Sequence, residues 1–506
     1  MALRLGDALR SAGYTAEGVL DRLGASELAA LGQDVTQPAR RVLARTTVDD
    51  PRDGLIRVFL LGETVPEATV DRSLARDLVS LGLVTSAPEG LRAVLDVRPY
   101  GEPDTDWYLV SDRGHPAHAD HVLGLGGASM TLARVTPRHP AGRVLDLGCG
   151  AGVQALHAAR HGDQLTVTDT NPRALQLTRL SALLSGIEPR RLRPLLGSLF
   201  EPVAGERFDL IVSNPPFVIS PGHRFTYRDA GLPGDELSRR VIRGAAEHLA
   251  PGGQAAVLGN WLHRPGESWS DRVSSWMAGT GVSAWIVQRE VQPCVDYALT
   301  WLRDSGTTEA DLDAALDGWL DEFEAQGAEA VGFGWVVLQA PGRRGGPANA
   351  LVSTSSTDAD PGSPPEPWLV VEDLSASPRL PDSTEVGQFL GGCDRVASTP
   401  FPDLLGRPWR LADGAVIERS STVADGLEVT VPPRLGLAGH VGSTGWRPGV
   451  ATPPQLCQAL LDPSGTWLGA RLDQAAAAVG LDPLDVLPTA LIALRELIRT
   501  AIVTSD

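Results

Sequence analysis

The chain has 506 residues, which is more than one ordinary domain holds, so we expect about two to four domains. Hydrophobic residues make up 42% and charged residues 21%, which is the balance of a folded globular protein. The sequence has no long apolar stretch and no apolar run near its start, so we expect a cytoplasmic protein without a membrane span or a secretory signal. The net charge of −18 argues against indiscriminate tight binding to phosphate backbones, since such binding depends on clustered cations.

Residues 1–125 predict an N-terminal domain of short helices followed by a small hairpin. Apolar residues at helical spacing occur in four segments, at 3–14, 15–23, 53–61 and 71–81. Two short strands are expected on either side of a Pro-Glu-Gly turn, at 82–84 and 91–97. Helices followed by a hairpin are typical of a winged helix, which binds nucleic acid in some proteins and is a structural or dimerising unit in others.

Residues 126–340 predict a domain of alternating strands and helices. Five strands are expected, at 143–146, 164–169, 192–196, 208–213 and 254–260. Helices are expected between them, at 154–161, 172–185 and 235–250. Repeated βα units imply a parallel sheet with helices on both faces. Two last strands, at 282–288 and 330–338, are expected to flank a helical insert at 308–325.

The last third of the chain predicts a linker and a further domain. Residues 341–366 are rich in Pro, Gly, Ser and Asp, a composition typical of a linker or long loop. Residues 367–506 predict an α+β domain with strands at 368–371 and 427–431 and helices at 472–479 and 490–501. This domain contains no motif that carries chemistry, so we expect an accessory or scaffold role for it.

Four cysteines are present, and none belongs to a CxxC pair. They are Cys149, Cys294, Cys393 and Cys457. Isolated cysteines of this kind indicate neither a disulfide framework nor a zinc site, and we expect no metal.

The clearest motif is a strand that runs into a glycine-rich turn, VLDLGCGAG at 144–152. The alternating glycines Gly148, Gly150 and Gly152 let the backbone turn sharply and approach a ligand without a Cβ in the way. The helix that follows offers its N-terminal N–H groups to a polar ligand. Because the spacing differs from the GxGxxG of dinucleotide binders, the turn suits a nucleoside with an amino-acid tail better than a pyrophosphate.

Two carboxylates belong to the same predicted site. Asp169 follows Gly148 by 21 residues (169 − 148) and ends the second strand, where it can accept hydrogen bonds from both ribose hydroxyls. Asp146 ends the first strand and can hold an amino-acid ammonium, directly or through water. A nicotinamide-dependent enzyme and a bare βα turn are the alternatives. The glycine-rich turn, Asp169 and the motif at 214–217 follow one another along the chain in the order that a cofactor site on such a sheet requires. This order favours a cofactor site over both alternatives.

The fourth predicted strand ends in Asn214-Pro215-Pro216-Phe217. A planar amino or amide nitrogen is a poor nucleophile, because its lone pair is delocalised, and it must be oriented and partly pyramidalised. The Asn214 side-chain oxygen and the Pro215 carbonyl can accept its two N–H bonds, and proline holds that carbonyl direction rigidly. Phe217 offers a flat face for stacking. The lone pair then faces a methyl group on a sulfonium, and catalysis depends mainly on positioning at about 3–3.5 Å.

Residues 141–260 resemble the S-adenosylmethionine-dependent methyltransferases that carry an Asn-Pro-Pro-Tyr or Asn-Pro-Pro-Phe tetrad. That class includes ribosomal- and transfer-RNA base methyltransferases, N6-adenine DNA methyltransferases and release-factor glutamine methyltransferases. The resemblance implies an α/β fold with a Rossmann-like seven-stranded sheet whose last strand is reversed, and it implies S-adenosylmethionine as cofactor. We expect the cofactor at Asp146, Gly148, Cys149, Gly150, Gly152, Asp169, Ser198 and Asn214. We expect the catalytic residues to be Asn214, Pro215, Pro216 and Phe217.

The sequence departs from this class at Ser198. The family's third-strand segment usually has an acidic residue facing the adenine amino group, and here the segment Gly197–Pro202 carries Ser198 instead. A hydroxyl can accept the same hydrogen bond without charge assistance, so weaker cofactor affinity is implied.

An RNA base is the substrate we expect first. Phe217 is the variant associated more with the RNA base enzymes, and a winged-helix-like unit precedes the catalytic domain. Arginines lie before the third strand, at Arg190, Arg191 and Arg193. Further polar side chains follow the tetrad where a substrate loop is expected, at His223, Arg224, Tyr227 and Arg228. An RNA base would have to be unstacked to enter the site.

Other readings remain open at this point. The stretch 229–240 resembles the segment after the tetrad in release-factor glutamine methyltransferases, and strong acidity suits a protein partner. A natural-product N-methyltransferase is a third reading. A protein that binds the cofactor without activity is a fourth, against which the intact tetrad argues. A small protein activator would leave no trace in this sequence.

Overall fold

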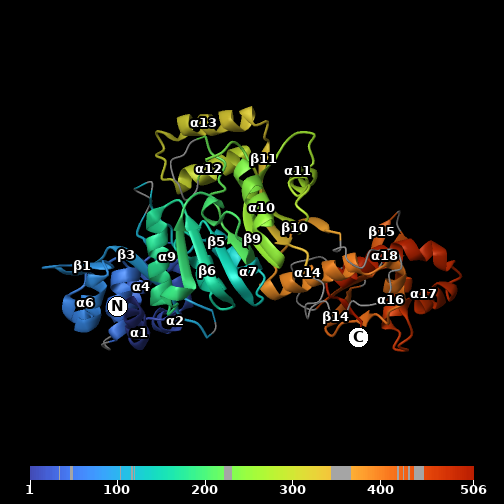
Figure 1. Cartoon of the computed structure of the whole chain (residues 1–506), viewed down its shortest axis with the longest axis horizontal. Helices are drawn as coiled ribbons and strands as arrows, with labels where there is room; N and C mark the ends of the chain where they lie inside the picture. Colours follow the sequence, from blue (N-terminus) through green and yellow to red (C-terminus); the bar gives the residue numbers. More distant parts are fainter. Residues whose placement is uncertain are drawn as a thin grey trace.

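The computed structural model describes residues 1–33, 35–45, 50–102, 104–114, 118, 120–221, 229, 231–342, 366–418, 421–424, 427–430, 433–437 and 450–505. Three regions follow one another along the long axis of the molecule: the N-terminal helices, a large central sheet and the C-terminal helices (Figure 1). Within these described ranges, no helix has the length and apolar character needed to cross a membrane.

An eight-stranded sheet forms the centre, in the order β12-β10-β11-β9-β8-β5-β6-β7. Its strands are β5 Ala141–Leu147, β6 Gly162–Asp169, β7 Leu192–Leu196, β8 Phe208–Ser213, β9 Leu249–His263, β10 Ser283–Pro293, β11 Ala330–Gln339 and β12 Leu369–Asp373. Strand β11 is antiparallel to both neighbours, and the other pairs are parallel. The predicted seven strands with a reversed last strand are therefore confirmed in β5–β11, and β12 adds an eighth.

Strand β12 comes from the segment that the sequence assigned to the C-terminal domain. It pairs in parallel with β10, from Ala284↔Leu369 to Gln288↔Asp373. The Trp285 indole N–H also donates to Glu372 at 2.7 Å. This strand covers the backbone edge that β10 would otherwise leave open. A local pattern of alternating residues predicts a strand, but it carries no information about which sheet the strand joins.

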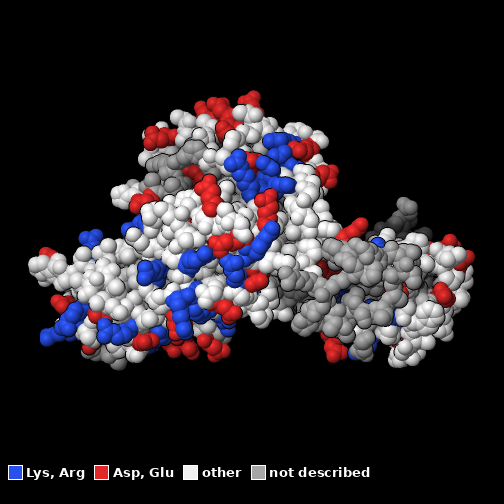
Figure 2. Space-filling model, in the orientation of Figure 1, with Lys and Arg blue, Asp and Glu red and all other residues white. Residues whose placement is uncertain are grey.

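Five helices flank the sheet: α7 Gly127–Val135, α8 Val153–Ala158, α9 Pro172–Leu184, α10 Glu236–His248 and α11 Trp269–Ser275. The insert before β11 is a pair of helices, α12 Cys294–Asp304 and α13 Leu312–Ala325, which lies across one end of the sheet (Figure 1). The sequence predicted α13 and missed α12, because α12 follows β10 with only the cap Pro293 to mark the change. Acidic side chains cover the outer side of this pair (Figure 2).

The N-terminal region has the expected helices and hairpin, followed by a second hairpin. Its helices are α1 Ala2–Ser11, α2 Ala16–Leu23, α3 Ala25–Leu31, α4 Gln37–Arg45, α5 Pro51–Leu55 with its π-helical continuation Ile56–Leu60, and α6 Arg72–Ser80. Strands β1 Val84–Ala87 and β2 Gly90–Ala93 form the first hairpin, and β3 Leu95–Tyr100 and β4 Trp107–Asp112 form the second. The predicted strand 91–97 is thus divided between the two hairpins.

The C-terminal region combines helices and short strands around its own apolar cluster, which includes Trp409, Leu456 and Leu497. Its helices are α14 Ser383–Ser398, α15 Phe401–Leu405, α16 Pro454–Leu461, α17 Leu468–Ala477 and α18 Pro483–Arg499. Its short strands are β13 Arg410–Leu411, β14 Ala415–Glu418, β15 Ser421–Ala424, β16 Leu427–Thr430, β17 Arg434–Leu437, β18 Val450–Ala451 and β19 Val503–Thr504.

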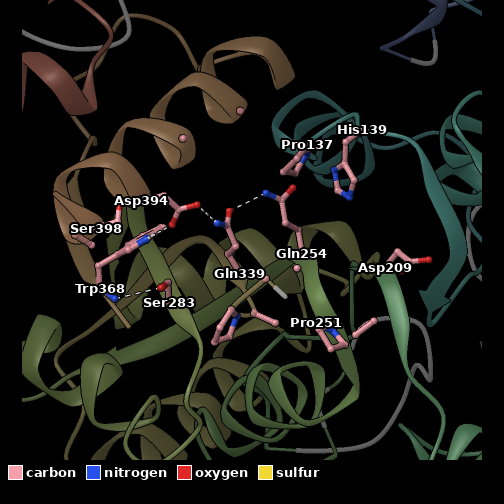
Figure 3. A pocket seen from close by; sticks show the side chains of 18 of the residues that line it. Pro137, His139, Asp209, Pro251, Gln254, Ser283, Gln339, Trp368, Asp394 and Ser398 are labelled. Carbon is pink, nitrogen blue, oxygen red and sulfur yellow. Dashed lines mark hydrogen bonds between the residues drawn. The ribbon is translucent and has the colours of Figure 1, made fainter. Parts of the chain in front are cut away.

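Helix α14 faces the sheet where the parallel strands begin, across a cavity of about 970 Å³ (Figure 3). A line of side-chain hydrogen bonds borders this cavity. Gln254 donates to Gln339 at 2.8 Å, Gln339 donates to Asp394, and the Trp368 indole donates to Asp394 at 2.7 Å. Because Asp394 lies on α14, this line connects α14 to β9 and β11.

Candidate functional site

The residues predicted to form the site meet at the opposite edge of the sheet, where the parallel strands end. Strands β7, β6, β5 and β8 are neighbours in that order and run in parallel, so their carboxyl ends lie side by side. These ends carry Ser198, Asp169, the turn 148–152 and Asn214, respectively. Ligands of open α/β sheets bind at this edge.

The glycine-rich turn adopts a backbone that only glycine takes readily. Gly148, Gly150 and Gly152 have φ values of 74°, 54° and 93°. A Cβ added at Gly148 or Gly150 would meet no atom within 4 Å, so open space borders this part of the turn. At Gly152 a Cβ would lie 2.9 Å from the Thr178 methyl on α9. The first two glycines therefore leave room for a ligand, and the third allows close packing on α9.

Asp169 is fixed in place by the turn. Its carboxylate accepts backbone N–H groups of Gly150 at 3.0 Å and Asn171 at 2.9 Å. The Thr178 hydroxyl holds the turn from the other side by donating to the Gly150 carbonyl at 2.8 Å. Burial raises the pKa of Asp169, while the two N–H donors act in the opposite direction. Each carboxylate oxygen has a second lone pair, so Asp169 can still accept hydroxyl donors.

Asp146 is almost completely buried, with 2% of its surface exposed. It accepts one hydrogen bond, from the Ala155 backbone N–H at 3.0 Å. Burial raises the pKa of this carboxyl to about 7. A cation bound next to Asp146 would compensate for the burial of its charge.

Asn214 directs one end of its amide at the protein and leaves the other end unpaired. Its Nδ2 donates to the Ser129 hydroxyl at 3.3 Å. Its Oδ1 is buried and has no hydrogen-bond donor among the residues that the structure describes. An unsatisfied buried acceptor costs roughly 1–3 kcal/mol, which a ligand N–H would recover. Pro215 is buried, and Phe217 is half-buried at the contact of two apolar clusters.

Cys149 and Ser198 are placed differently from the other predicted cofactor residues. The Cys149 thiol is buried in the apolar core, where the Thr178 hydroxyl lies 3.4 Å from its sulfur, so its side chain does not face the open part of the turn. Ser198 is exposed and directly follows Gly197, whose N–H donates to the Asp169 carbonyl at 3.0 Å.

The arginines before the third strand are engaged with protein groups. Arg190 pairs with Glu188 at 2.5 Å, and Arg193 pairs with Glu206 at 2.8 Å. Arg191 donates to backbone carbonyls of residues 159 and 162, both at 2.7 Å. The side chains predicted to follow the tetrad lie outside the described residues: His223, Arg224, Tyr227 and Arg228.

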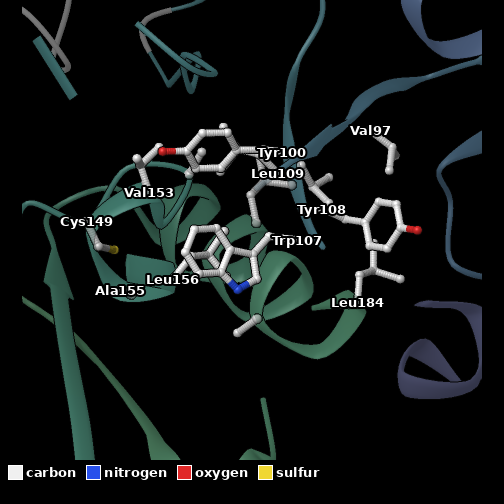
Figure 4. Packing of buried hydrophobic residues seen from close by; sticks show 14 of the residues in the cluster. Val97, Tyr100, Trp107, Tyr108, Leu109, Cys149, Val153, Ala155, Leu156 and Leu184 are labelled. Carbon is white, nitrogen blue, oxygen red and sulfur yellow. The ribbon is translucent and has the colours of Figure 1, made fainter. Parts of the chain in front are cut away.

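The second N-terminal hairpin supports the helix that follows the turn. Figure 4 shows Tyr100 and Trp107 packed beside Val153 and Leu156 of α8. His157, also on α8, lies edge-on to both rings at 5.5 Å and 5.0 Å. Its Nε2 is hydrogen-bonded to the Tyr100 hydroxyl, and burial lowers the pKa of this histidine to about 4. This support is not predictable from local sequence patterns, because the pairing joins segments that are 50 residues apart along the chain (157 − 107).

Two further residues that the sequence analysis missed contact the site. Gln154, 5% exposed on α8, donates from its side chain to the Ser129 carbonyl at 2.8 Å. Ser129 lies on α7 and accepts the Asn214 amide. The sequence offers only a weak signal for them, the glycine pair Gly126-Gly127 where a short helix begins before the first strand of the sheet.

Two families match parts of this chain. Residues 124–265 match the family described as Methyltransferase small domain, and residues 11–94 match one described as Domain of unknown function (DUF7059). The first match includes the glycine-rich turn, Asp146, Asp169 and the tetrad.

Similar proteins with names include ribosomal RNA methyltransferases. Ribosomal RNA small subunit methyltransferase C of Escherichia coli O1:K1 / APEC is 31% identical over 215 residues, which are 40% of this chain and 57% of that protein. The protein of the same name from Escherichia fergusonii is 35% identical over 136 residues, which are 26% of this chain and 35% of that protein. This chain therefore spans between 35% and 57% of the length of these two curated relatives.

Among solved structures, an rRNA methylase from Streptococcus thermophilus is 14% identical over 42% of this chain and 94% of its own, with a TM-score of 0.24. A SAM-dependent methyltransferase from Thiobacillus denitrificans in complex with S-adenosyl-L-homocysteine is 18% identical over 43% of this chain and 92% of its own, with a TM-score of 0.26. The expectation of an S-adenosylmethionine-dependent methyltransferase domain is confirmed for residues 124–265, which match the family described as Methyltransferase small domain.

Proposed function

We propose that this protein transfers a methyl group from S-adenosylmethionine to a planar amino nitrogen of a base in small-subunit ribosomal RNA. The observation that carries this proposal is the buried, unpaired Oδ1 of Asn214 at the end of β8. An acceptor in that state favours a substrate that brings its own N–H donor. The RNA substrate rests on the likeness to ribosomal RNA small subunit methyltransferase C.

The residues around the turn fit the cofactor. The open space beside Gly148 and Gly150 is room that a Cβ would otherwise occupy. Asp169 would hold the ribose hydroxyls and Asp146 the amino-acid ammonium. Asp146 is buried and Asp169 is half-buried, which suits donors that replace lost water. When bound, S-adenosylmethionine supplies an electrophilic methyl group on a sulfonium.

The tetrad would orient the acceptor nitrogen. Asn214 Oδ1 and the Pro215 carbonyl would each accept one N–H of the amino group, which leaves its lone pair directed away from both acceptors. Phe217 would stack on the base. These contacts hold the nitrogen in one geometry, and such positioning alone accounts for large rate effects. The spare proton would pass to water after the nitrogen becomes cationic, so no strong base is required.

A protein substrate is the second candidate, and the α12–α13 pair favours it. Tyr297 on α12 accepts the Ile219 backbone N–H at 3.0 Å, which ties this pair to the segment directly after the tetrad. Helix α13 and the residues before it are acidic: Glu309, Asp311, Asp313, Asp317, Asp321, Glu322 and Glu324. A phosphate backbone is repelled by such a surface, and a basic protein loop is attracted.

Methyl-labelled cofactor distinguishes the two candidates. The protein is incubated with labelled S-adenosylmethionine and, separately, with naked small-subunit rRNA, assembled small subunits, transfer RNA and peptide-chain release factors. Our proposal predicts label in the small-subunit rRNA, on an exocyclic amino group after digestion to nucleosides. Label found only in the release factors, or on a ring carbon or ribose, would overturn it. A heat-inactivated sample run in parallel controls for carry-over of label.

A further inference from the structure

We infer that Ser129 is a positioning residue that holds the Asn214 side chain in place at the end of β8, beside the proposed substrate site. This inference rests on the proposed function for its catalytic consequence, although the contact itself can be tested without any activity. Ser129 belongs to α7, which precedes the first strand of the sheet and lies outside the turn and the tetrad.

The side-chain amide of Asn214 has two ends of similar size and opposite hydrogen-bonding character. The Asn214 side chain can rotate unless a neighbour holds it, and in the structure its Nδ2 is 3.3 Å from the Ser129 hydroxyl. A serine hydroxyl can both accept and donate, so this contact holds the amide in place whichever of its ends faces Ser129. With Nδ2 at Ser129, Oδ1 is the end that has no donor among the described residues.

Ser129 is itself held by the helix that follows the glycine-rich turn. The Gln154 side chain donates to the Ser129 carbonyl at 2.8 Å, and Gln154 is 5% exposed. Three elements are therefore joined in a row, with α8 bound to α7 and α7 bound to the end of β8. Because α8 begins at the turn, the position of the Asn214 oxygen is set relative to the place where the methyl donor would lie.

The test compares three variants. Ser129→Ala removes the acceptor, and Ser129→Thr keeps a hydroxyl at the same place. Thr131→Ala is the matched control, because Thr131 lies on the same helix and its hydroxyl accepts Arg289 at 3.2 Å, away from Asn214. The single-turnover rate on small-subunit rRNA and the cofactor dissociation constant are measured for each. We expect Ser129→Ala to slow transfer about tenfold with KM and cofactor affinity nearly unchanged, and Ser129→Thr and Thr131→Ala to stay near wild type.

Asparagine side-chain NMR signals provide the readout without activity. The chain contains four asparagines, so selective ¹⁵N-asparagine labelling gives few NH₂ signals, and the Asn214 pair is assigned by its loss in Asn214→Ala. We expect the chemical shifts of the Asn214 NH₂ pair to move toward those of a free amide in Ser129→Ala. In Ser129→Thr and Thr131→Ala these chemical shifts should stay as in the wild type.

An unmoved Asn214 pair in Ser129→Ala would overturn the inference, and so would a full transfer rate. If wild-type protein labels no RNA, the proposed function fails instead, and the NMR comparison still decides whether Ser129 holds the Asn214 side chain.

Discussion

The N-terminal and C-terminal regions attach to the same sheet at different places. The N-terminal region packs behind the proposed cofactor site. Its α1 touches α9 so closely that a Cβ on Gly6 would lie 2.0 Å from the Leu184 carbonyl oxygen. Strand β4 is bound to the same helix, since Val110 donates its N–H to the Ser181 hydroxyl on α9 and Tyr108 donates to the hydroxyl of the cap residue Ser185, both at 2.9 Å. Helix α9 follows the strand that ends in Asp169.

The C-terminal region reaches the sheet away from that site. Strand β12 extends the β10 edge, and α14 faces the ends where the parallel strands begin. Phe389 of α14 packs on Trp285 with ring centroids 4.6 Å apart. The proposed cofactor site is therefore supported by residues outside 124–265, the range that matches the methyltransferase family. The N-terminal region supports the cofactor side, whereas the C-terminal region closes a sheet edge.

Two glycine substitutions, one in each terminal region, give the largest expected difference between the N-terminal and C-terminal regions. Gly6→Ala forces apart α1 and the end of α9, and Gly392→Ala forces apart α14 and α18, where a Cβ would lie 2.6 Å from the Ile498 carbonyl oxygen. Each change should lower the free energy of unfolding by about 1–3 kcal/mol. Calorimetry of cofactor binding should then detect weakened affinity in Gly6→Ala alone. Equal cofactor affinity in the two variants would contradict the claim that only the N-terminal region supports the proposed cofactor site.

Two half-buried carboxylates provide the next contrast. Asp169→Ala removes a charged acceptor from the proposed ribose site and should weaken cofactor binding by about 1.5–3 kcal/mol. Asp394→Ala removes the acceptor shared by Trp368 and Gln339, and it should lower stability while leaving cofactor affinity unchanged. Titration calorimetry on both variants checks this, and unchanged affinity in Asp169→Ala would refute the ribose assignment.

A smaller effect is expected from pH. Burial raises the pKa of Asp146 to about 7, so the carboxyl holds its proton below that pH and must lose it to bind an ammonium. Cofactor affinity should therefore fall as pH decreases from about 7, by up to tenfold per pH unit. The same raised pKa means that the folded state binds more protons than the unfolded state, so Asp146 contributes less stability as pH rises from about 4 to 7. In Asp146→Asn the affinity should be weaker and independent of pH over this range, and an unchanged pH slope there would contradict this role for Asp146.

Local features of the sequence predicted much of the domain around the central sheet. Strands β7 and β8 begin and end where the pattern placed them, and the glycine-rich turn has the left-handed backbone that its glycines suggested. These features depend on neighbouring residues, as the turn needs glycine and the buried parallel strand β8 needs an apolar run.

Features that depend on distant partners were missed. Strand β12 was expected in another domain, because its sheet partner β10 is separated from it by β11 and the linker. The Ser129–Asn214 hydrogen bond joins residues that are 85 positions apart, and serine carries no signature of such a partner. Cys149 was expected beside the cofactor, yet its thiol is buried in the core, where an isolated cysteine more often lies.

The most direct test of the account is the single-turnover rate of Asn214→Ala on small-subunit rRNA, measured with cofactor affinity in the same sample. We predict that the variant binds S-adenosylmethionine as the wild type does and transfers the methyl group at least about 10²-fold more slowly, because the substrate nitrogen loses one of its two acceptors. Near-normal transfer with normal cofactor binding would contradict the role of Asn214 and, with it, the proposed orientation of the substrate nitrogen.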